Sequence, residues 1–308
     1  MHRSTVLTRL MIMIGSASSG ALWAVETAPS RSDAPTVNVG VEVGYKAFDL
    51  RWVSGGAPGN PPFASNWSQE RALATAIRVS NRADSIYALD ARFEYDLVYD
   101  GANRHSGFSD DGGTEVYRSE NSADGGYLWR NTFDAGVHLW SDNGRLLLTP
   151  QLGWISATQH LVQRDGDQVL PATGPYSGLA SSYTARWQGP RLSVGGAWQC
   201  LPTLVLSGRI GYAWTAYNGA ADWNLRSDLE HPLSLTQRGE AQGIDLGVAL
   251  DWHQTPRLGW HAALAFEHWR TVGGTDRIHD ATGEDQVTSL DEVRLRSLLL
   301  SLGTQWRF

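Results

Sequence analysis

Residues 37–46 read VNVGVEVGYK, and this stretch alternates strictly between two kinds of side chain. The apolar set is Val37, Val39, Val41, Val43 and Tyr45, and the positions between them hold Asn38, Gly40, Glu42, Gly44 and Lys46. Successive side chains of a β-strand point to opposite faces of the sheet. The alternation therefore predicts a strand with one apolar and one polar face.

The same period of two returns in nine later segments: 72–80, 86–99, 127–140, 145–154, 179–198, 204–214, 244–252, 260–267 and 298–308. In one of them the parity changes, because Tyr183 and Trp187 lie out of phase with Leu192 and Trp198. We interpret this change as a β-bulge at Gly189-Pro190, where an extra residue would shift the phase. Ten strands of one type predict an all-β, antiparallel protein.

The connections between these segments alternate in length. After the even-numbered segments they are short, with the sequences NRAD, SDNG, QCLPT and HQTP, and after the odd-numbered segments they are long and rich in Gly, Asp, Asn and Ser. Strict alternation of short turns and long loops is typical of outer-membrane barrels, with the turns in the periplasm and the loops outside. A closed barrel also pairs every backbone polar group, as a bilayer requires. We predict a ten-stranded up-and-down transmembrane β-barrel over residues 36–308.

The two ends of the chain fit an exported barrel. Residues 1–24 have the basic start, short apolar run and small residues of a signal peptide, cleaved after Ala21 or Ala24. Residues 25–35 would form a periplasmic segment, and the terminal SLGTQWRF, 301–308, would be the closing strand. The 14 Trp residues are many for a soluble core, and Trp is favoured where lipid meets water. The predicted location is the outer membrane.

Several other classes of protein are disfavoured. Cys200 is the only cysteine, so no intrachain disulfide is expected. The net charge is −7 and the basic residues are dispersed, which argues against nucleic acid as a partner. His105, His160 and His279 fall in separate loops without the spacing of metal ligands, so no metal site is predicted.

Many charged residues share the inward parity of the predicted barrel. They are Glu42, Lys46, Arg78, Asp90, Arg92, Glu94, Asp96, Arg130, Asp134, His138, Arg145, Arg186, Arg191, Arg209, Asp245, Asp251 and Glu267. Ten strands enclose little space once large side chains point inward. We expect these groups to neutralise one another in an ion-pair network that fills the lumen, with Arg78 or Arg92 as the partner of Asp96.

The upper rim is predicted to be acidic, because the long loops contain many carboxylates. These are Asp96, Asp100, Asp110, Asp111, Glu115 and Glu120 near the second loop, Asp222, Asp228 and Glu230 in the fourth, and Asp276, Asp280, Glu284, Asp285, Asp291 and Glu292 in the fifth. Such a rim would attract cationic ligands.

Ten strands, five long outer loops and an acidic rim resemble the omptins, outer-membrane endopeptidases that cut next to basic residues. The closest local match is SSYTARWQGPRLSVGGAWQCLPTLVLSGRIGYAW, 181–214, and a weaker match is YDLVYDGANRHSGFSDDGG, 95–113. Elsewhere the resemblance is limited to the arrangement of strands and loops. The resemblance implies a requirement for lipopolysaccharide and no other cofactor.

The omptin mechanism places a water between an acidic pair and an Asp-His pair, where a base takes its proton. At the acidic pair this chain has Asp96-Leu97-Val98, and at the Asp-x-His position it has Asp222-Trp223-Asn224. A gapped alignment offers SDLEHP instead. The resemblance then implies a catalytic set drawn from Asp96, Asp100, Asp222, Asp228 and His231, with Asp110 and Glu230 as substrate-binding residues.

Two classes of function remain open at this point. One is a surface endopeptidase for basic peptides, and the other is a non-catalytic adhesin or binding barrel in which the same acids attract cationic peptides or host proteins. A narrow porin is a third possibility. In each case we expect a monomer surrounded by outer-membrane lipid and lipopolysaccharide.

Overall fold

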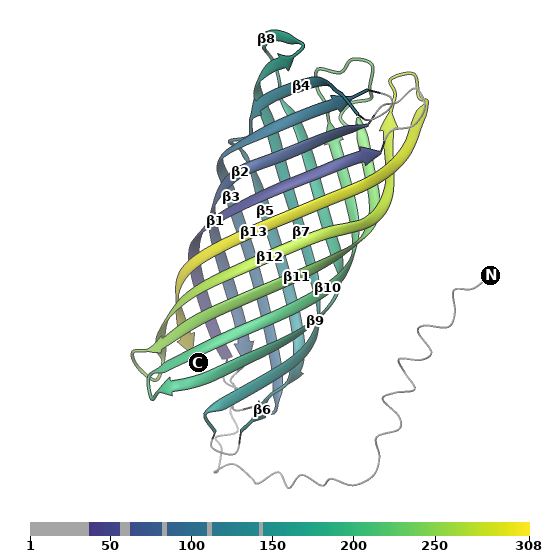
Figure 1. Ribbon diagram of the computed structural model, residues 1–308. Coiled ribbons are helices and arrows are strands. Elements are labelled where there is room, and N and C mark those ends of the chain that lie inside the picture. The colour runs from purple at the N-terminus through teal and green to yellow at the C-terminus, as the bar shows by residue number, and fades with distance from the viewer. Residues whose placement is uncertain (1–36, 56–61, 82–84, 110–112, 142–143) are drawn as a thin grey trace, which may run out of the picture. The chain divides into compact units, whose positions relative to one another are not determined.

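The computed structural model describes residues 37–308, apart from 56–61, 82–84, 110–112 and 142–143. The predicted signal peptide, the segment 25–35 and Asp110 therefore lie outside the described residues. Within them the chain forms strands and connections, and it contains no helix that is long and apolar enough to cross a membrane. Figure 1 shows a single tilted barrel.

Ten strand positions form a closed antiparallel ring, as the sequence predicts. They are β1 (Val37–Gly55), β2 (Phe63–Asn81), β3 (Tyr87–Phe108), β5 (Gly126–Val137), β7 (Leu146–Leu170), β9 (Ser181–Leu201), β10 (Leu204–Asp222), β11 (Leu235–His253), β12 (Leu258–His279) and β13 (Asp285–Arg307). The ring closes where β13 pairs with β1, from Asn38 opposite Arg307 to Gly55 opposite Ser289.

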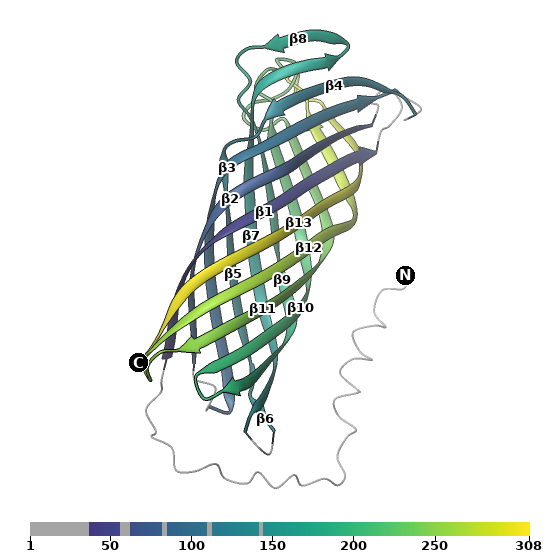
Figure 2. The same cartoon turned by 60° about the vertical axis from the view of Figure 1, so that its left-hand side comes forward.

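Three short strands extend this ring. β4 (Glu115–Ser122) pairs with the upper parts of β3 and β7, and so continues the position of β5 towards the extracellular end. β6 (Leu139–Trp140) continues β5 at the other end, and β8 (Ala172–Tyr176) forms a hairpin with β7. Figure 2 shows β4 and β8 at the end of the barrel opposite to the C-terminus.

The strands are much longer than a membrane requires. β7 has 25 residues and β13 has 23, whereas a membrane-spanning strand needs roughly 9–11. A large part of the sequence predicted as long loops is therefore strand, since both 47–55 and 63–71 belong to the first hairpin. The barrel extends well beyond the bilayer on the extracellular side, and its connections there are shorter than expected.

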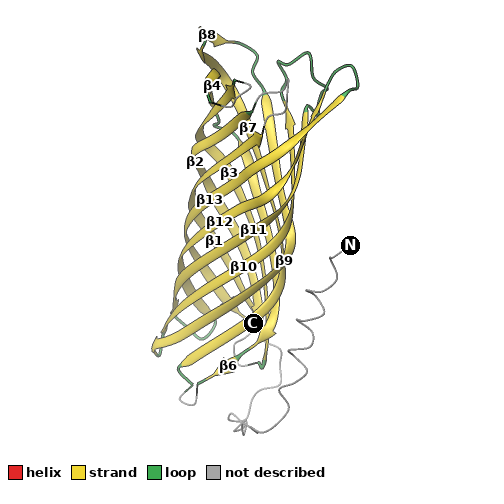
Figure 3. Ribbon diagram, turned by 45° about the vertical axis from the view of Figure 1, so that its right-hand side comes forward, coloured by secondary structure: helices red, strands yellow, loops and turns green. Residues whose placement is uncertain are grey.

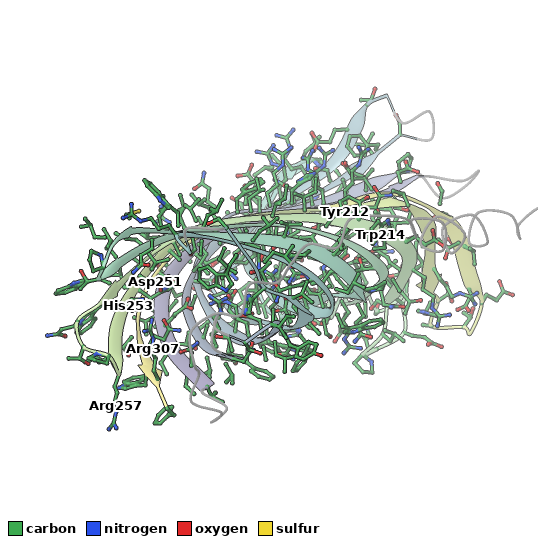
Figure 4. The ribbon with its side chains drawn as sticks, turned by 90° about the horizontal axis from the view of Figure 1, so that it is seen from below. Tyr212, Trp214, Asp251, His253, Arg257 and Arg307 are labelled. Carbon is green, nitrogen blue, oxygen red and sulfur yellow. The ribbon has the colours of Figure 1, made fainter. Side chains whose placement is uncertain are left out.

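The outer face is apolar over the lower part of the wall. Trp252 pairs with Trp260 near the periplasmic turns, and Trp154 and Trp214 lie farther up their strands, each about half exposed. Figure 4 shows Tyr212 and Trp214 on β10, well away from Asp251, His253 and Arg307 at the turn end. Aromatic rows separated by apolar residues are the expected boundaries of a bilayer.

The lower lumen contains the predicted ion pairs. Lys46 contacts Glu94 and lies 2.6 Å from Asp96, and all three are almost completely buried. The other pairs include Arg92 with Glu42 at 2.7 Å, Arg78 with Asp90 at 2.7 Å, and Arg191 with Asp134 and Asp245 at 2.6 and 2.8 Å. The predicted ion pairs are present, although Asp96 pairs with Lys46 rather than with Arg78 or Arg92. They do not fill the lower lumen, because they line cavities of about 330 and 550 Å³.

Above the ion pairs the lumen is filled by an apolar core. Its large side chains include Trp52, Trp67, Tyr183, Trp187 and Tyr217, each no more than 1% exposed. Trp67 stacks on Tyr183 with ring centroids 5.1 Å apart, and Trp187 lies 4.5 Å from Tyr217. All ten ring positions contribute to this cluster, so it fills the cross-section of the barrel.

This core corrects two predictions for the segment 179–198. The pairing of β9 with β7 runs without a register shift from Ser181 to Trp198, so there is no bulge at Gly189-Pro190. Tyr183 and Trp187 point inward with Arg191, and the parity changes only because the lumen changes from ionic to apolar. Arg186 was predicted to point inward and instead lies exposed on the outer face.

Replacing Trp187 with alanine should lower the free energy of unfolding by ~3–5 kcal/mol, because it leaves a large cavity in the core. It also removes the hydrogen bond from Trp187 Nε1 to Gln159 Oε1 (2.7 Å). The measurement is urea unfolding of the refolded barrel in lipid vesicles. Arg186→Ala, one residue away on the outer face, should change stability by roughly 0.5 kcal/mol or less. Equal losses in the two variants would contradict the apolar core.

Candidate functional site

The extracellular mouth of the barrel is covered by the connection from β10 to β11, residues 223–234, which we call the mouth loop. Leu229 is buried in the core and forms an isolated bridge with Asp280. The Glu230 N–H donates to the His279 carbonyl (2.9 Å), and the Ala281 N–H donates to the Asp228 carbonyl (3.0 Å). These contacts fix the loop to the neighbouring connection between β12 and β13. Figure 3 shows the loops gathered at this end.

His231 lies in the mouth loop and contacts Asp222, the last residue of β10. Its Nδ1 lies 2.6 Å from Asp222 Oδ1, and its Nε2 lies 3.1 Å from the carbonyl oxygen of Arg226. Both partners only accept hydrogen bonds, so both ring nitrogens must donate, as in the charged imidazolium. The hydrogen bond that His231 donates to Asp222 raises the pKa of His231 above its usual value. In this arrangement neither nitrogen is available to accept a proton from water.

Asn224 occupies the position of the omptin histidine and has a different role. Its Oδ1 accepts hydrogen bonds from the Ala180 N–H (2.9 Å) and the Ser181 hydroxyl (3.1 Å). Its Nδ2 donates to the Gly178 carbonyl at 2.7 Å. Both ends of the amide therefore hold the mouth loop against the segment that precedes β9. A histidine could not make the same three contacts.

Asp96 lies on β3 in the ion-pair layer and not at the extracellular mouth. It is 1% exposed and hydrogen-bonded to Lys46 in the ion-pair layer. Val98, at the second acidic position of the omptin pattern, belongs to the apolar core. Along β3 this core residue comes between Asp96 and His105, which lines the mouth. The structure brings Asp222 and His231 together, but it does not place Asp96 opposite them.

The other predicted site residues are dispersed over the rim. Asp100 is exposed and pairs with Arg71 at 2.9 Å, and Asp228 pairs with Arg226 at 2.6 Å. Glu230 is exposed in the mouth loop, and Asp110 lies outside the described residues. Among the residues that the structure describes, no three His, Cys, Asp or Glu side chains are grouped in a way that could hold a metal ion.

A pocket of about 450 Å³ opens beneath the mouth loop, and the sequence did not predict it. Its aromatic walls come from Phe63, His105, Tyr117, Tyr176 and Trp223. The ring of Trp223 lies 5.6 Å from both Phe63 and His105, and it stacks on Trp52 of the core at 6.4 Å. The pocket floor is thus continuous with the packed core, which holds these rings in place.

One signal for this interior was present in the sequence. Trp52 has the same parity as Lys46 on β1, so an uninterrupted strand places both side chains in the lumen. The high Trp content was instead assigned to the lipid boundary. The mouth loop has no periodic pattern, and nothing in its sequence indicated that Trp223 folds back over the core.

The family model described as Pom, Protochlamydia outer membrane protein, matches residues 40–307. The chain belongs to this family. The chain is therefore an outer-membrane β-barrel, as predicted. A comparison with curated proteins finds no significant match.

Among solved structures, this Pom family member is similar to the outer membrane protease OmpT of Escherichia coli. The two are 15% identical, with a TM-score of 0.71 over 92% of this chain and 99% of that chain. At this identity the likeness shows the omptin-like fold alone. The attachment invasion locus protein Ail of Yersinia pestis (8% identity, TM-score 0.28, 88% and 98% covered) and a major outer membrane protein of Thermus thermophilus (13%, 0.33, 88% and 99%) are too dissimilar to add to this.

The Asp222–His231 contact in this Pom family member should depend on pH. A raised pKa means that the contact stabilises the mouth loop fully below about pH 6.5, the usual His value. That stabilisation is lost as the pH rises through the higher pKa of the folded protein. NMR titration of the His231 ring should give a pKa above 6.5, and Asp222→Asn should lower it. An unchanged pKa in that variant would contradict the contact.

Proposed function

We propose that this outer-membrane barrel is a non-catalytic surface protein that holds a ligand at its extracellular mouth. The observation that carries the proposal is the geometry of His231, whose Nδ1 lies 2.6 Å from Asp222 Oδ1 and whose Nε2 lies 3.1 Å from the Arg226 carbonyl oxygen. Both nitrogens donate to these oxygens when the imidazole is charged. A histidine that acts as a general base needs a nitrogen with a free lone pair.

The described residues at the acidic half of the omptin pattern, Asp96 and Val98, do not face the mouth. Asp96 is neutralised by Lys46 in the lumen, and Val98 cannot bind a water. Asn224 secures the mouth loop with its whole amide group. The pocket under that loop is enclosed by aromatic rings packed on a rigid core, and preformed apolar pockets with few polar groups are typical of binding sites.

A surface endopeptidase for basic peptides is the second candidate, and one observation favours it. Asp222 orients His231 at 2.6 Å, as an Asp-His pair requires. Catalysis would require the mouth loop to release Nε2 from the Arg226 carbonyl. It would also require an exposed acid, such as Asp100, to approach.

Peptide cleavage distinguishes the two candidates. Refolded protein with lipopolysaccharide should not cleave fluorogenic Arg-Arg or Lys-Lys peptides. The reason is that His231 has both ring nitrogens in contact with oxygen atoms and Asp96 does not lie opposite it. The matched variants are His231→Asn and His279→Asn. His279 is also in contact with an aspartate, Asp285, at 2.8 Å. Cleavage that His231→Asn abolishes and His279→Asn preserves would establish the endopeptidase.

Cationic peptides or host proteins were expected as partners of an acidic rim. Several of those acids already have an arginine partner: Asp100 with Arg71, Glu120 with Arg104, Asp228 with Arg226 and Glu292 with Arg270. The negative field at the mouth is weaker than the count of acids suggests. We therefore propose that recognition relies on the aromatic pocket more than on the acidic rim, in a monomeric barrel.

Lipopolysaccharide is the lipid partner that we propose. Arg294 on β13 lies directly opposite both Arg51 on β1 and Arg270 on β12, on the outer face. Like charges directly opposite on neighbouring strands are destabilising. On the same outer face the pair of His268 and Arg296 separates this arginine row from the apolar pair of Phe266 and Leu298. We therefore propose that the row meets the headgroup region of the outer leaflet. Phosphate groups there would offset the repulsion.

Loss of the arginine row should weaken lipopolysaccharide binding. Each arginine near a charged membrane surface contributes about 1 kcal/mol. Arg51→Gln combined with Arg294→Gln should lower the affinity at least ~tenfold, and added salt should reduce the difference. Binding is measured by the rise in melting temperature with added lipopolysaccharide. Arg238→Gln, exposed on β11, serves as the control. Equal behaviour of the double variant and the control would contradict the assignment.

A further inference from the structure

The charge on the wall of the extracellular pocket is opposite to that expected for a site that takes basic peptides. Among the described residues that line the pocket, Arg226 is the only one with a permanent charge. The remaining wall is apolar or aromatic, and it includes Phe63, Leu225 and Trp223. The described lining residues thus include a guanidinium group and no carboxylate, and Asp228, the partner of Arg226, lies outside the lining.

Arg226 can bind an additional anion without a large rearrangement. Its Nε and Nη2 donate to Asp228 at 2.8 and 2.6 Å, and both side chains are more than half exposed. An exposed ion pair of this kind contributes little to stability. The guanidinium has five N–H donors, so further donors remain for a ligand. A carboxylate is a good partner for this planar group.

The body of the ligand is indicated by the rings. Trp223 is fixed edge-on to Phe63 at 5.6 Å, with planes at 72°, and it stacks on Trp52 with planes at 26°. The backbone near Trp223 is held by the Ser234 hydroxyl, which accepts from the Trp223 N–H at 3.0 Å. Preordered rings of this kind favour a flat aromatic ligand, which gains stacking and edge contacts in addition to burial.

We propose that the pocket binds a small aromatic monocarboxylic acid. Its ring lies against Trp223 and Tyr117, and its carboxylate accepts hydrogen bonds from Arg226. The volume of about 450 Å³ lies within the range of small-molecule sites. This inference rests on the proposed binding function and specifies its ligand class.

Three probes of equal shape test the charge preference. They are naphthalene-2-carboxylate, naphthalene-2-methanol and naphthalene-2-methylammonium, titrated calorimetrically into the full chain in nanodiscs. The carboxylate should bind at least ~tenfold more tightly than the alcohol, and the ammonium should bind most weakly. Arg226→Gln should reduce the affinity for the carboxylate to that for the alcohol and leave the alcohol unchanged. Trp223→Ala should weaken all three.

Arg277→Gln is the matched control, because Arg277 is an exposed arginine paired with Asp285 at 2.7 Å and does not line the pocket. This variant should bind the probes like the wild type. Preference for the ammonium, an unchanged carboxylate affinity in Arg226→Gln, or no binding of any probe would overturn the ligand class. Those outcomes would not affect the separate prediction that the protein does not cleave dibasic peptides. Cleavage of dibasic peptides would overturn the proposed function itself.

Discussion

The structure depends on one constraint, which is that side chains have to occupy the lumen of a ten-stranded barrel. The bilayer requires a closed ring, since every backbone N–H and C=O in hydrocarbon needs a partner. Closure then creates an interior whose side chains must satisfy one another. This chain solves the problem in two layers, with ion pairs around Lys46 and Arg191 below and the aromatic core of Trp67, Trp187 and Tyr217 above.

The two layers have different consequences. Buried ion pairs fix the lower lumen only when each charge has its partners, because an unpaired charge there would be strongly destabilising. The aromatic core is held by ring packing and by hydrogen bonds such as those that Tyr183 and Tyr217 donate to Gln237, and it forms the base of the extracellular mouth. Leu229 of the mouth loop packs on that base and Trp223 stacks on it, so the pocket is a direct product of how the bore is filled.

The sequence predicts the wall of the barrel well and its interior only in part. Alternation along VNVGVEVGYK follows from the pleat of a strand, and the difference between turns and loops gives the ring and its direction. The lengths of the strands were underestimated because outside the bilayer both faces of a strand lose the simple apolar-polar contrast. At Gly189-Pro190 an inward Trp187 looked like a change of phase, although the strand is regular.

The candidate site shows a similar division. Asp222 and His231 were each singled out from the sequence, but their contact depends on how the mouth loop folds back on itself. No local pattern encodes that fold, since it arises from hydrogen bonds to distant segments, such as those of Asn224 with Gly178 and Ala180. The pocket is not predictable for the same reason, because its walls come from β2, β3, β4, β7, β8, β9, β12 and the mouth loop.

The central claim is that an apolar core closes the lumen between the extracellular pocket and the ion-pair layer. Ion conductance of the purified barrel in a planar bilayer tests this claim most directly. A closed core predicts no current above that of the protein-free bilayer at moderate voltage. A steady current that is proportional to voltage and to the number of inserted barrels would contradict it.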